Sequence, residues 1–392
     1  MSDVFVLSGK RTAIGDYGKT LKDIPPTKLG EIAIRAALAA GNVDATEIQQ
    51  VVMGNVIHTE PRDCYLSRVC AVDAGIPFET PALTVNRLCG SGLQAIISAA
   101  QSIMLGDAAL AVAGGAESMS RGGYLLPSER WGARLGDAKV IDMVVGTLND
   151  PFGGGHMGIT AENVAARYEI SRDRQDAFAV ESHRRAVVAL EAGYFKEQIT
   201  AVELPSRKGT VIFDTDEHVR ADTTLASLGG LKPAFKKDGT VTAGNASGLN
   251  DGAAALVLAS GAEVTRRGAK PLGRLVAYGH AGVDPAYMGL GPIPATKKAL
   301  EKAGLSIADI DVIESNEAFA AQACAVAQDL GFDPAKVNPN GGAVALGHPV
   351  GATGAIITVK ALYELQRTRG RYALVTMCIG GGQGIAAIFE RV

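Results

Sequence analysis

Two stretches of this 392-residue chain repeat one local pattern, and the repetition restricts the possible fold more than any other feature. In the first stretch, the turn LCGSG at 88–92 opens an apolar helix, and the next strand ends at the glycine pair 114–115. In the second, LGHP at 346–349 opens another apolar helix, and the next strand ends at glycines 380–381. A recurrence of this kind indicates that one α/β unit has been duplicated.

The two copies differ in where the second arm of a hairpin follows the glycine pair. In the later copy the apolar arm GIAAIFERV follows at once, whereas in the earlier copy the matching arm GAAALVLAS lies more than a hundred residues away. The simplest explanation is a segment inserted into one hairpin of the first copy. We therefore predict a first half at 1–118 plus 249–270, an inserted domain at 119–248 and a second half at 271–392.

Strands and helices alternate along both copies, which is typical of a mainly parallel sheet covered by helices. In the inserted segment, Ser171 and Asp173 favour the start of one long amphipathic helix that ends at Gly193. Elsewhere we predict strands at 3–8, 51–57, 83–86, 108–113, 252–259, 272–279, 310–315 and 372–377, and helices at 28–40, 92–105, 295–303, 317–330 and about 351–365.

Composition excludes several classes of protein. Lys plus Arg number 38 and Asp plus Glu 41, so the net charge of −3 argues against nucleic-acid binding. No uninterrupted apolar run reaches the roughly 18 residues of a membrane span, so we expect no membrane partner. The five cysteines are scattered and contain no CxxC pair, which argues against a disulfide framework or structural zinc and favours a cytoplasmic protein.

Cys89 is the first candidate for chemistry. It lies between a predicted strand and an apolar helix, where free N–H groups and the helix dipole favour the thiolate and lower the pKa of the thiol. Gly90 and Gly92 leave room for a ligand or another backbone to approach. The alternative is that Cys89 is a small buried apolar residue, as most free cysteines are.

Three further residues lie in comparable turns. His348 lies in the glycine-rich turn before an apolar helix, with Pro349 suited to the first helical position; a capping or core histidine is the alternative. Cys378 precedes GGGQG, which we interpret as a hairpin turn with exposed N–H groups, because too little chain follows for a dinucleotide-binding unit. Asn316 follows a strand, where binding sites form, although an ordinary helix N-cap is the alternative.

Together these residues describe one reaction. If the two copies pack about a pseudo-twofold axis, Cys89 and His348 occupy equivalent positions and converge. A cysteine–histidine pair can form an acyl-thioester, and a second cysteine can move another proton. This combination predicts acyl transfer between thioesters, with a carbon–carbon bond made or broken.

Seven blocks of the chain, in order, resemble signature segments of thiolases, the acetyl-CoA acetyltransferase and β-ketothiolase family. The resemblance covers the chain from end to end. It implies two βαβαβαββ halves stacked as a five-layered αβαβα core, with a loop domain inserted in the first half. It also implies a homo-oligomer, expected to be a tetramer built as a dimer of dimers, with 120–140 resembling a tetramerisation loop. The blocks are NRLCGSGLQA, AGGAESMS, HMGITAENVA, GTVTAGNASGLNDGAAA, ESNEAFAAQA, NPNGGAVALGHPVGATGA and MCIGGGQGIAAIFE.

The resemblance also implies a role for each turn residue. Cys89 would carry the acyl group, and His348 would activate it and bind the thioester oxygen together with a water held by Asn316. Cys378 would be the acid and base at the α-carbon, and the N–H groups of Cys89 and Gly380 would bind the acyl-enzyme oxyanion. The implied reaction is a reversible ping-pong Claisen condensation of acetyl-CoA with acetyl-CoA or a short acyl-CoA, and thiolysis of short 3-ketoacyl-CoA.

Coenzyme A and acetyl-CoA are implied as substrates, and we expect no tightly bound cofactor and no metal. Arg207 and Lys208 are either phosphate contacts or an ordinary exposed basic pair. The NDPFGGGHMG stretch resembles that of the broader-specificity enzymes and favours acyl chains longer than acetoacetyl. By resemblance the residues that contact CoA are Leu148, His156, Met157, Arg220, Ser227, Phe235, Ser247, Met288, Ala318 and Phe319, with loop-domain core or solvated surface as the alternative for each.

Three other functions compete with this interpretation. A decarboxylating ketoacyl synthase usually has a second catalytic histidine where this chain has Asn316. A cysteine–histidine hydrolase that releases acids from thioesters would not need Cys378. A non-catalytic scaffold is disfavoured because Cys89, Asn316, His348 and Cys378 are all present.

Overall fold

The computed structural model describes residues 3–207 and 209–392. The prediction that Lys208 contacts phosphate lies outside the described residues.

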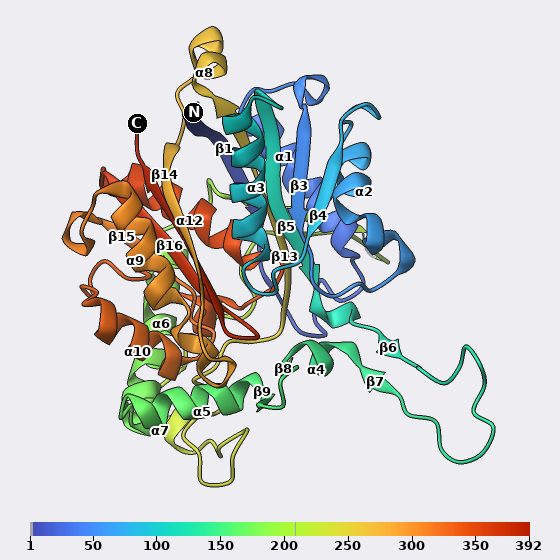
Figure 1. Ribbon diagram of the computed structural model, residues 1–392, viewed down its shortest axis with the longest axis vertical. Helices are drawn as coiled ribbons and strands as arrows, with labels where there is room; N and C mark the ends of the chain where they lie inside the picture. Colours follow the sequence, from blue (N-terminus) through green and yellow to red (C-terminus); the bar gives the residue numbers. More distant parts are fainter. Residues whose placement is uncertain (1–2, 208) are drawn as a thin grey trace.

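The first half of the protein is built around five strands. The strands lie in the order β1-β13-β5-β3-β4 (Figure 1), with β3 parallel to β4 and β5, and β13 antiparallel to β5 and β1. Their bounds are β1 Val4–Thr12, β3 Gln50–Gly54, β4 Ala82–Val85, β5 Leu110–Ser118 and β13 Asn250–Ser260.

The second half repeats this arrangement in the order β14-β17-β16-β15. Again a parallel pair, β15 and β16, lies beside an antiparallel hairpin, β16 and β17. The outermost parallel strand is reduced here to a bridge between Ile313 and Val337. A short antiparallel contact between β1 and β14 joins the edges of the two sheets. The bounds are β14 Gly273–Gly282, β15 Val312–Ser315, β16 Tyr372–Ile379 and β17 Gln383–Glu390.

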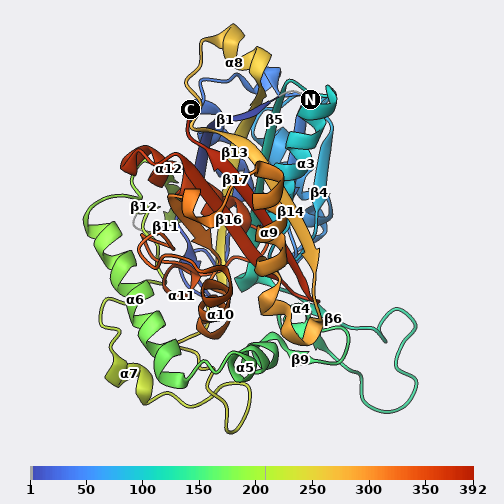
Figure 2. The ribbon, with the colours of Figure 1, turned by 60° about the vertical axis from the view of Figure 1, so that its left-hand side comes forward.

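Helices and sheets stack in five layers, as predicted. The central layer holds α3 (Ser91–Leu105) and α12 (Thr353–Thr368), which contact each other and strands of both halves. α1 (Pro26–Ala40) and α2 (Leu66–Asp73) cover the outside of the first sheet. α9 (Pro292–Ala303) covers the second sheet, with α10 (Ala320–Leu330) packed against α9 (Figure 2). α3 is apolar on nearly every side because both of its faces are buried, whereas α12 also buries Lys360 and Glu364.

α3 lies in an apolar stretch that resembles a membrane span. The window Leu88–Leu105 is long and apolar enough to cross a membrane by length and hydropathy alone, although no uninterrupted apolar run of the sequence is that long. In the fold, however, Leu93, Ile96 and Ile97 of this helix are fully buried in the largest apolar cluster. We therefore interpret it as a core helix.

The two halves come into backbone contact close to the glycine pair of β5. A Cβ atom on Gly115 would lie 2.2 Å from the carbonyl oxygen of Gly351, and one on Gly114 would lie 2.1 Å from that of Ala254. Any side chain at Gly115 would therefore separate the first half from the turn that carries His348. β5 runs on to Ser118, so the prediction that the strand ends at the glycine pair is wrong; Gly114 and Gly115 are instead sites of close approach within the strand.

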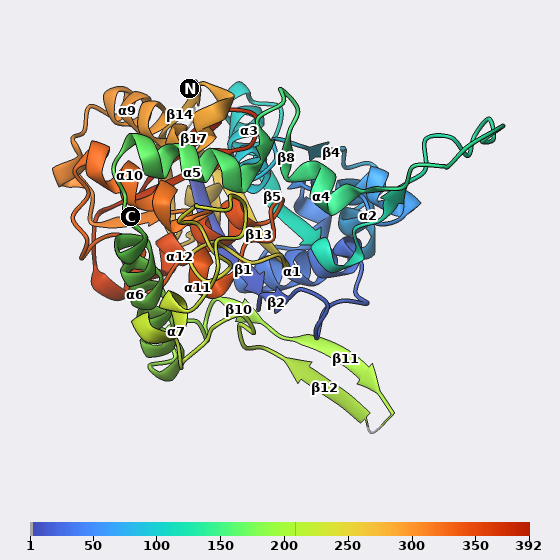
Figure 3. The ribbon, with the colours of Figure 1, turned by 90° about the horizontal axis from the view of Figure 1, so that it is seen from below.

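Residues 119–249 run between the paired strands β5 and β13 and cover the lower end of the five-layered core (Figure 3). Its longest helix, α6 (Arg172–Glu191), is capped by Ser171 as predicted. A buried bidentate ion pair between Arg11 and Asp216, at 2.7 and 2.9 Å, anchors this segment to β1. Its other elements are η3 Met119–Arg121, β6 Tyr124–Leu125, β7 Ile141–Asp142, α4 Met143–Thr147, β8 Asn149–Asp150, β9 Gly155–His156, α5 Met157–Arg167, β10 Ile199–Thr200, β11 Val202–Ser206, β12 Gly209–Phe213 and α7 Leu225–Gly229.

Some predicted boundaries differ from the structure. α10 begins at Ala320 rather than 317, because its N-cap is Phe319. A short helix, α11 (Ala343–Leu346), precedes the His348 turn in place of a strand. α12 begins only at Thr353, so Pro349 is not its first helical residue. The remaining short elements are β2 Gly15–Asp16, η1 Ala45–Glu47, η2 Pro61–Tyr65, α8 Gly261–Arg267, η4 Pro285–Leu290 and η5 Ile307–Asp309.

Candidate active site

A cavity of about 460 Å³ lies where turns from both halves meet the inserted segment. Cys89, His348, Cys378 and Gly380 all line it. These residues are separated by up to 291 positions along the chain (89 to 380), and the duplicated fold brings them together as predicted.

Cys89 lies on a tight turn whose shape depends on its neighbours. Leu88 has a left-handed backbone (φ 46°), which is uncommon for a leucine and turns the chain sharply between β4 and α3. The Ser91 hydroxyl holds the turn closed: it accepts from Arg87 N–H at 2.8 Å and donates to the Leu88 carbonyl at 2.7 Å. Cys89 is thereby presented to the cavity just before the helix begins.

The electrostatics of Cys89 differ from the prediction. Burial raises the pKa of its thiol to about 11, although hydrogen bonds from the N–H groups of Gly380 and of Cys89 itself lower it. The helix N-terminus therefore does not make Cys89 a thiolate at rest, because the cost of burying the charge is larger. A base is needed to remove its proton.

His348 is held rigidly and is uncharged. The backbone N–H of His348 donates to Asn250 Oδ1 at 2.9 Å, and the ring Nδ1 lies 2.7 Å from the Thr353 hydroxyl. The preceding Gly347 has φ 102°, and a Cβ atom there would collide with the Asn250 side chain. Burial lowers the pKa of His348 to about 4, so the imidazole is neutral and able to accept a proton.

Asn316 lies at the end of β15, in contact with the His348 imidazole. Its Nδ2 is 3.5 Å from His348 Nε2. Its Oδ1 is buried and has no hydrogen-bond partner among the described residues. Asn316 does not cap α10, so the N-cap alternative is wrong. An unpaired buried acceptor beside the imidazole suits a residue that binds a water molecule.

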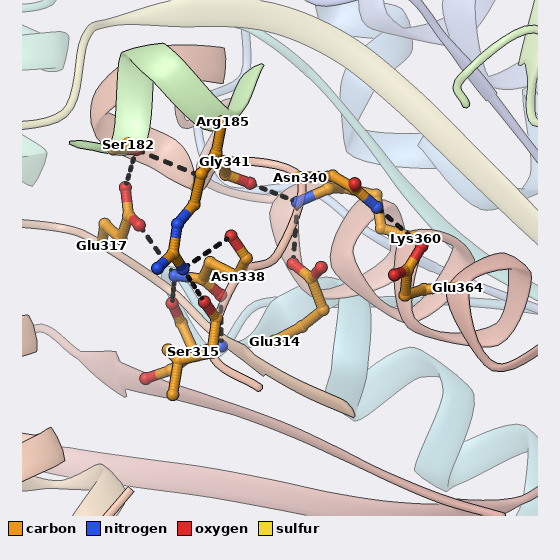
Figure 4. Close-up of polar contacts among 12 residues, drawn as sticks. Ser182, Arg185, Glu314, Ser315, Glu317, Asn338, Asn340, Gly341, Lys360 and Glu364 are labelled. Atoms are coloured by element: carbon orange, nitrogen blue, oxygen red, sulfur yellow. Dashed lines mark hydrogen bonds and ion pairs between the residues drawn. The ribbon is translucent and has the colours of Figure 1, made fainter. Parts of the chain in front are cut away.

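A buried polar network supports the strand end that carries Asn316 (Figure 4). Glu317 accepts hydrogen bonds from Ser182 Oγ at 2.7 Å, Asn338 Nδ2 at 2.8 Å and Val344 N–H at 3.1 Å. Because Ser182 belongs to α6 and Val344 to α11, one carboxylate links the inserted segment, the Asn316 strand and the turn before His348. Sequence reasoning did not identify this role, since the three partners are remote along the chain.

Cys378 lies near the end of β16, and the expected hairpin follows it. The turn to β17 contains Gly381 and Gly382 with φ of 78° and 83°, a conformation that only glycine adopts readily. Cys378 is fully buried, and burial together with the nearby Cys89 sulfur raises the pKa of its thiol. The second thiol is therefore also protonated at rest.

The same cavity extends along the inserted segment. Every residue that the resemblance assigns to CoA lines it except Ser227. Ser227 is instead exposed on α7, where its hydroxyl donates to the Thr224 carbonyl at 2.9 Å. The His156 ring stacks on Phe235 with centroids 4.7 Å apart, and Phe235 meets Phe319 edge-on at 6.1 Å. These rings form an apolar wall suited to a long thin substrate arm.

Two residues that sequence reasoning left aside also line this cavity. His218 Nδ1 lies 2.8 Å from Asp16 Oδ1, and the hydrogen bond to His218 lowers the pKa of the Asp16 carboxyl. No sequence signal identifies the pair, because its members are 202 positions apart. Within residues 3–207 and 209–392, no cluster of His, Cys, Asp and Glu could hold a metal ion.

Comparison with known proteins identifies the family of this chain. Residues 4–262 match the thiolase N-terminal domain, and residues 269–391 match the thiolase C-terminal domain. The chain belongs to the thiolase family. It is thus an acyltransferase. Enzymes of the thiolase family catalyse Claisen condensation and thiolysis of acyl-CoA thioesters.

Named relatives of this thiolase match it over almost their whole length. The β-ketothiolase BktB of Cupriavidus necator is 66% identical, covering 100% of this chain and 99% of the relative. An acetyl-CoA acetyltransferase of Pseudomonas aeruginosa is 49% identical, covering 100% of both. The crystal structure of human mitochondrial 3-ketoacyl-CoA thiolase in complex with CoA superposes with a TM-score of 0.97 at 47% identity, covering 100% of this chain and 98% of that one.

Proposed function

We propose that this thiolase is a short-chain β-ketothiolase that works through an acyl-Cys89 intermediate. The observation that carries the proposal is the meeting of two cysteine thiols, Cys89 and Cys378, with the neutral His348 in one cavity. Hydrolysis of a thioester needs only one thiol. A second buried thiol supplies the proton transfer at carbon that a Claisen condensation requires.

In the first step, His348 Nε2 takes the Cys89 proton while the sulfur attacks the thioester carbonyl of acetyl-CoA. The tetrahedral intermediate collapses to acyl-Cys89, and the departing CoA thiolate takes the proton of Cys378. This leaves Cys378 as a thiolate and His348 with a proton on Nε2. The N–H groups of Cys89 and Gly380 would bind the oxyanion. The hydrogen bond of each N–H to the Cys89 sulfur supports this, because it places both donors beside the reacting centre.

In the second step, the Cys378 thiolate removes a proton from the α-carbon of a second acetyl-CoA, and the resulting enolate attacks the acyl carbon of acyl-Cys89. His348 Nε2–H and a water on the unpaired Oδ1 of Asn316 would hold the enolate oxygen. A 3-ketoacyl-CoA forms, and the released Cys89 sulfur takes the proton from His348 Nε2. Thiolysis is the reverse.

CoA would lie along the inserted segment with its pantetheine arm between the ring wall and Met288. The lining of the cavity by Leu148, Met157, Ser247 and Ala318 supports this course. Arg220 lines the same cavity and would lie near the adenine end. Ser227 would reach CoA only outside the cavity, because it is on the exposed face of α7.

The acyl group would occupy a small apolar cluster beside Cys89. Cys89 packs there against the apolar cluster formed by Ile57, Met119, Val144 and Val350. Gly153 and Gly155 adopt φ of 92° and 79° in the hairpin that ends at His156, a conformation that favours glycine. The apolar surroundings of Cys89 support short 3-ketoacyl chains beyond acetoacetyl, as does the similarity to a β-ketothiolase.

We also propose a cytoplasmic homotetramer. Edge strand β4 lies beside the exposed side chains Phe78 (75% exposed) and Leu83, which suits pairing with a second copy. The long loop between β6 and β7 projects far from the body (Figure 1) and exposes Trp131 and Leu135, which suits a second contact. The proposed division of the chain stays 1–118 plus 249–270, 119–248 and 271–392.

The deciding experiment measures the fate of acetoacetyl-CoA with the purified enzyme, with and without free CoA. Consumption only with CoA, yielding two acetyl-CoA, is the expected result. Equal consumption without CoA would identify water as the acceptor and replace the proposal by a hydrolase.

Two cysteine variants test whether Cys378 is the base at the α-carbon while Cys89 carries the acyl group. We expect Cys378→Ala to form acyl-Cys89 from acetyl-CoA but to lose exchange of the α-proton with solvent, by at least about a hundredfold. Cys64→Ala, which removes an exposed thiol outside the cavity, should exchange at the normal rate. The readout is deuterium incorporation into acetyl-CoA by mass spectrometry, and rapid exchange in Cys378→Ala would exclude that residue as the base.

A further inference from the structure

The side of the His348 imidazole that faces away from Asn316 makes one short polar contact. His348 Nδ1 lies 2.7 Å from Thr353 Oγ1, and Thr353 Oγ1 in turn lies 2.9 Å from the Pro349 carbonyl oxygen, to which it donates. Thr353 is the first residue of α12 and is only 2% exposed. Its backbone N–H also donates to the Pro349 carbonyl at 2.9 Å, which fixes the hydroxyl in place.

The number of protons decides the direction of these contacts. A threonine hydroxyl has one proton, whereas the Pro349 carbonyl can only accept. If the hydroxyl proton goes to Pro349, His348 Nδ1–H donates to Thr353 and both contacts are hydrogen bonds. If the proton instead goes to His348 Nδ1, lone pairs of the Thr353 hydroxyl and the Pro349 carbonyl face each other at 2.9 Å with no proton between them. The Pro349 carbonyl is paired in either case, because it accepts from the N–H groups of Ala352 and Thr353. The difference is therefore this repulsion between two oxygens, which the first arrangement avoids.

The rest of the site agrees with the first arrangement. With a proton on Nδ1, the lone pair of the neutral imidazole is on Nε2. Nε2 faces Asn316 Nδ2, a donor, at 3.5 Å, and His348 lines the cavity that also holds Cys89. In the opposite tautomer Nε2–H would face another N–H group and could accept nothing from a thiol.

We propose that Thr353 is a positioning residue that holds His348 in the Nδ1–H tautomer and so keeps Nε2 available as the base for Cys89. The inference rests on the proposed function of His348. Thr353 has the place of the carboxylate in a serine-protease triad, but it is neutral. A hydroxyl orients the ring without stabilising an imidazolium, so cysteine and histidine rest as a neutral pair.

The variants Thr353→Val and Thr353→Ser separate orientation from packing. Valine keeps the branched shape and removes the oxygen, whereas serine keeps the oxygen and loses the methyl group. Thr358→Val is a matched control on the same helix: Thr358 is also fully buried and donates to a backbone carbonyl, Gly354 O at 2.7 Å. Among the described residues the Thr358 hydroxyl bonds to Gly354 and not to His348, so its loss tests only the cost of removing a buried hydroxyl.

The first readout is the tautomer of His348, taken from long-range nitrogen–proton spectra of enzyme labelled at histidine, with His348→Asn used to assign the signal. The positioning role of Thr353 is supported if His348 in the unmodified enzyme carries its proton on Nδ1 and none on Nε2, and if Thr353→Val loses this preference. A proton on Nε2 in the unmodified enzyme would overturn the inference without any variant.

The second readout is the rate at which iodoacetamide alkylates Cys89 between pH 6 and 9. We expect the rate for Thr353→Val to fall about tenfold or more, with Thr353→Ser and Thr358→Val close to the unmodified enzyme. An unchanged rate in folded Thr353→Val would overturn the inference. Because His348→Asn is measured alongside, an unchanged rate in that variant would instead contradict the proposed function of His348.

Discussion

Lys360 forms a buried ion pair with Glu314 on the strand that leads to Asn316, and we predict that Lys360→Met destabilises the fold. Lys360 Nζ lies 2.8 Å from Glu314 Oε2 and donates to the Gly341 carbonyl at 2.7 Å (Figure 4). Both side chains of the ion pair are almost completely buried, at 2% and 1% exposure. Lys360→Met keeps most of the side-chain volume and removes the positive charge.

The expected loss of unfolding free energy follows from the buried carboxylate that Lys360→Met leaves unpaired. Glu314 Oε1 already has no hydrogen-bond partner among the described residues, and Oε2 would lose the hydrogen bond from Lys360 Nζ. Breaking a buried ion pair on one side costs about 3–5 kcal/mol of unfolding free energy. The exposed pair Lys297–Asp329 is the matched control, because Lys297→Met there should cost less than about 1 kcal/mol.

The cost should depend on pH in a direction that identifies its cause. Burial raises the pKa of Glu314 above that of a free glutamate, whereas Lys360 lowers it, so Lys360→Met raises it further. A raised carboxyl pKa means that the folded state holds the proton more tightly. Stability is therefore lost as the pH rises from the unfolded pKa through the folded pKa, by about 1.4 kcal/mol for each pH unit between them.

Urea unfolding at pH 5 and pH 8, at one protomer concentration, measures both effects. We expect Lys360→Met to be destabilised more at pH 8 than at pH 5, and the double variant with Glu314→Gln to recover much of the loss at pH 8. A loss below about 1 kcal/mol at pH 8, or an equal loss at both pH values, would refute the reasoning.

Two further predictions concern close packing and the substrate arm. Gly115→Ala places a methyl group 2.2 Å from the Gly351 oxygen, so we expect a loss of at least about 1–3 kcal/mol in urea unfolding and reduced thiolysis. Gly123→Ala, which meets nothing within 4 Å, should change neither. Phe235→Ala removes the stacked and edge-on rings, so KM for acetyl-CoA should rise about tenfold (about 1.4 kcal/mol) with little change in kcat. Phe78→Ala, outside the cavity, should leave steady-state KM unchanged.

The sequence predicted the fold well where local rules apply. The repeated turn, helix and strand pattern indicated two halves with an inserted segment, and β5 and β13 pair across that segment. The hairpin after Cys378 was predicted because too little chain follows it for any other unit. By contrast, the starts of α10 and α12 were placed two to three residues early. Both helices begin where tertiary packing permits, rather than at the first suitable capping residue.

The candidate site could be predicted only in its principal residues. Cys89, His348 and Cys378 stand out because each lies beside glycines that must turn or approach another backbone. Thr353 and Glu317 do not stand out, because a threonine or a glutamate at a helix start is commonplace. Their importance comes from the atoms opposite them.

By itself, then, the sequence determined where the chain turns and which reactive side chains those turns expose, because backbone conformation and hydrophobic periodicity act over a few residues. Only the tertiary structure decided the protonation of those side chains. Burial raises the pKa of the Cys89 thiol, reversing the prediction from its helix, and lowers that of His348. It likewise decided that His218 lines the cavity and that Ser227 does not. Desolvation and hydrogen-bond partners depend on atoms that are remote along the chain and become neighbours only when the two halves and the inserted segment pack together.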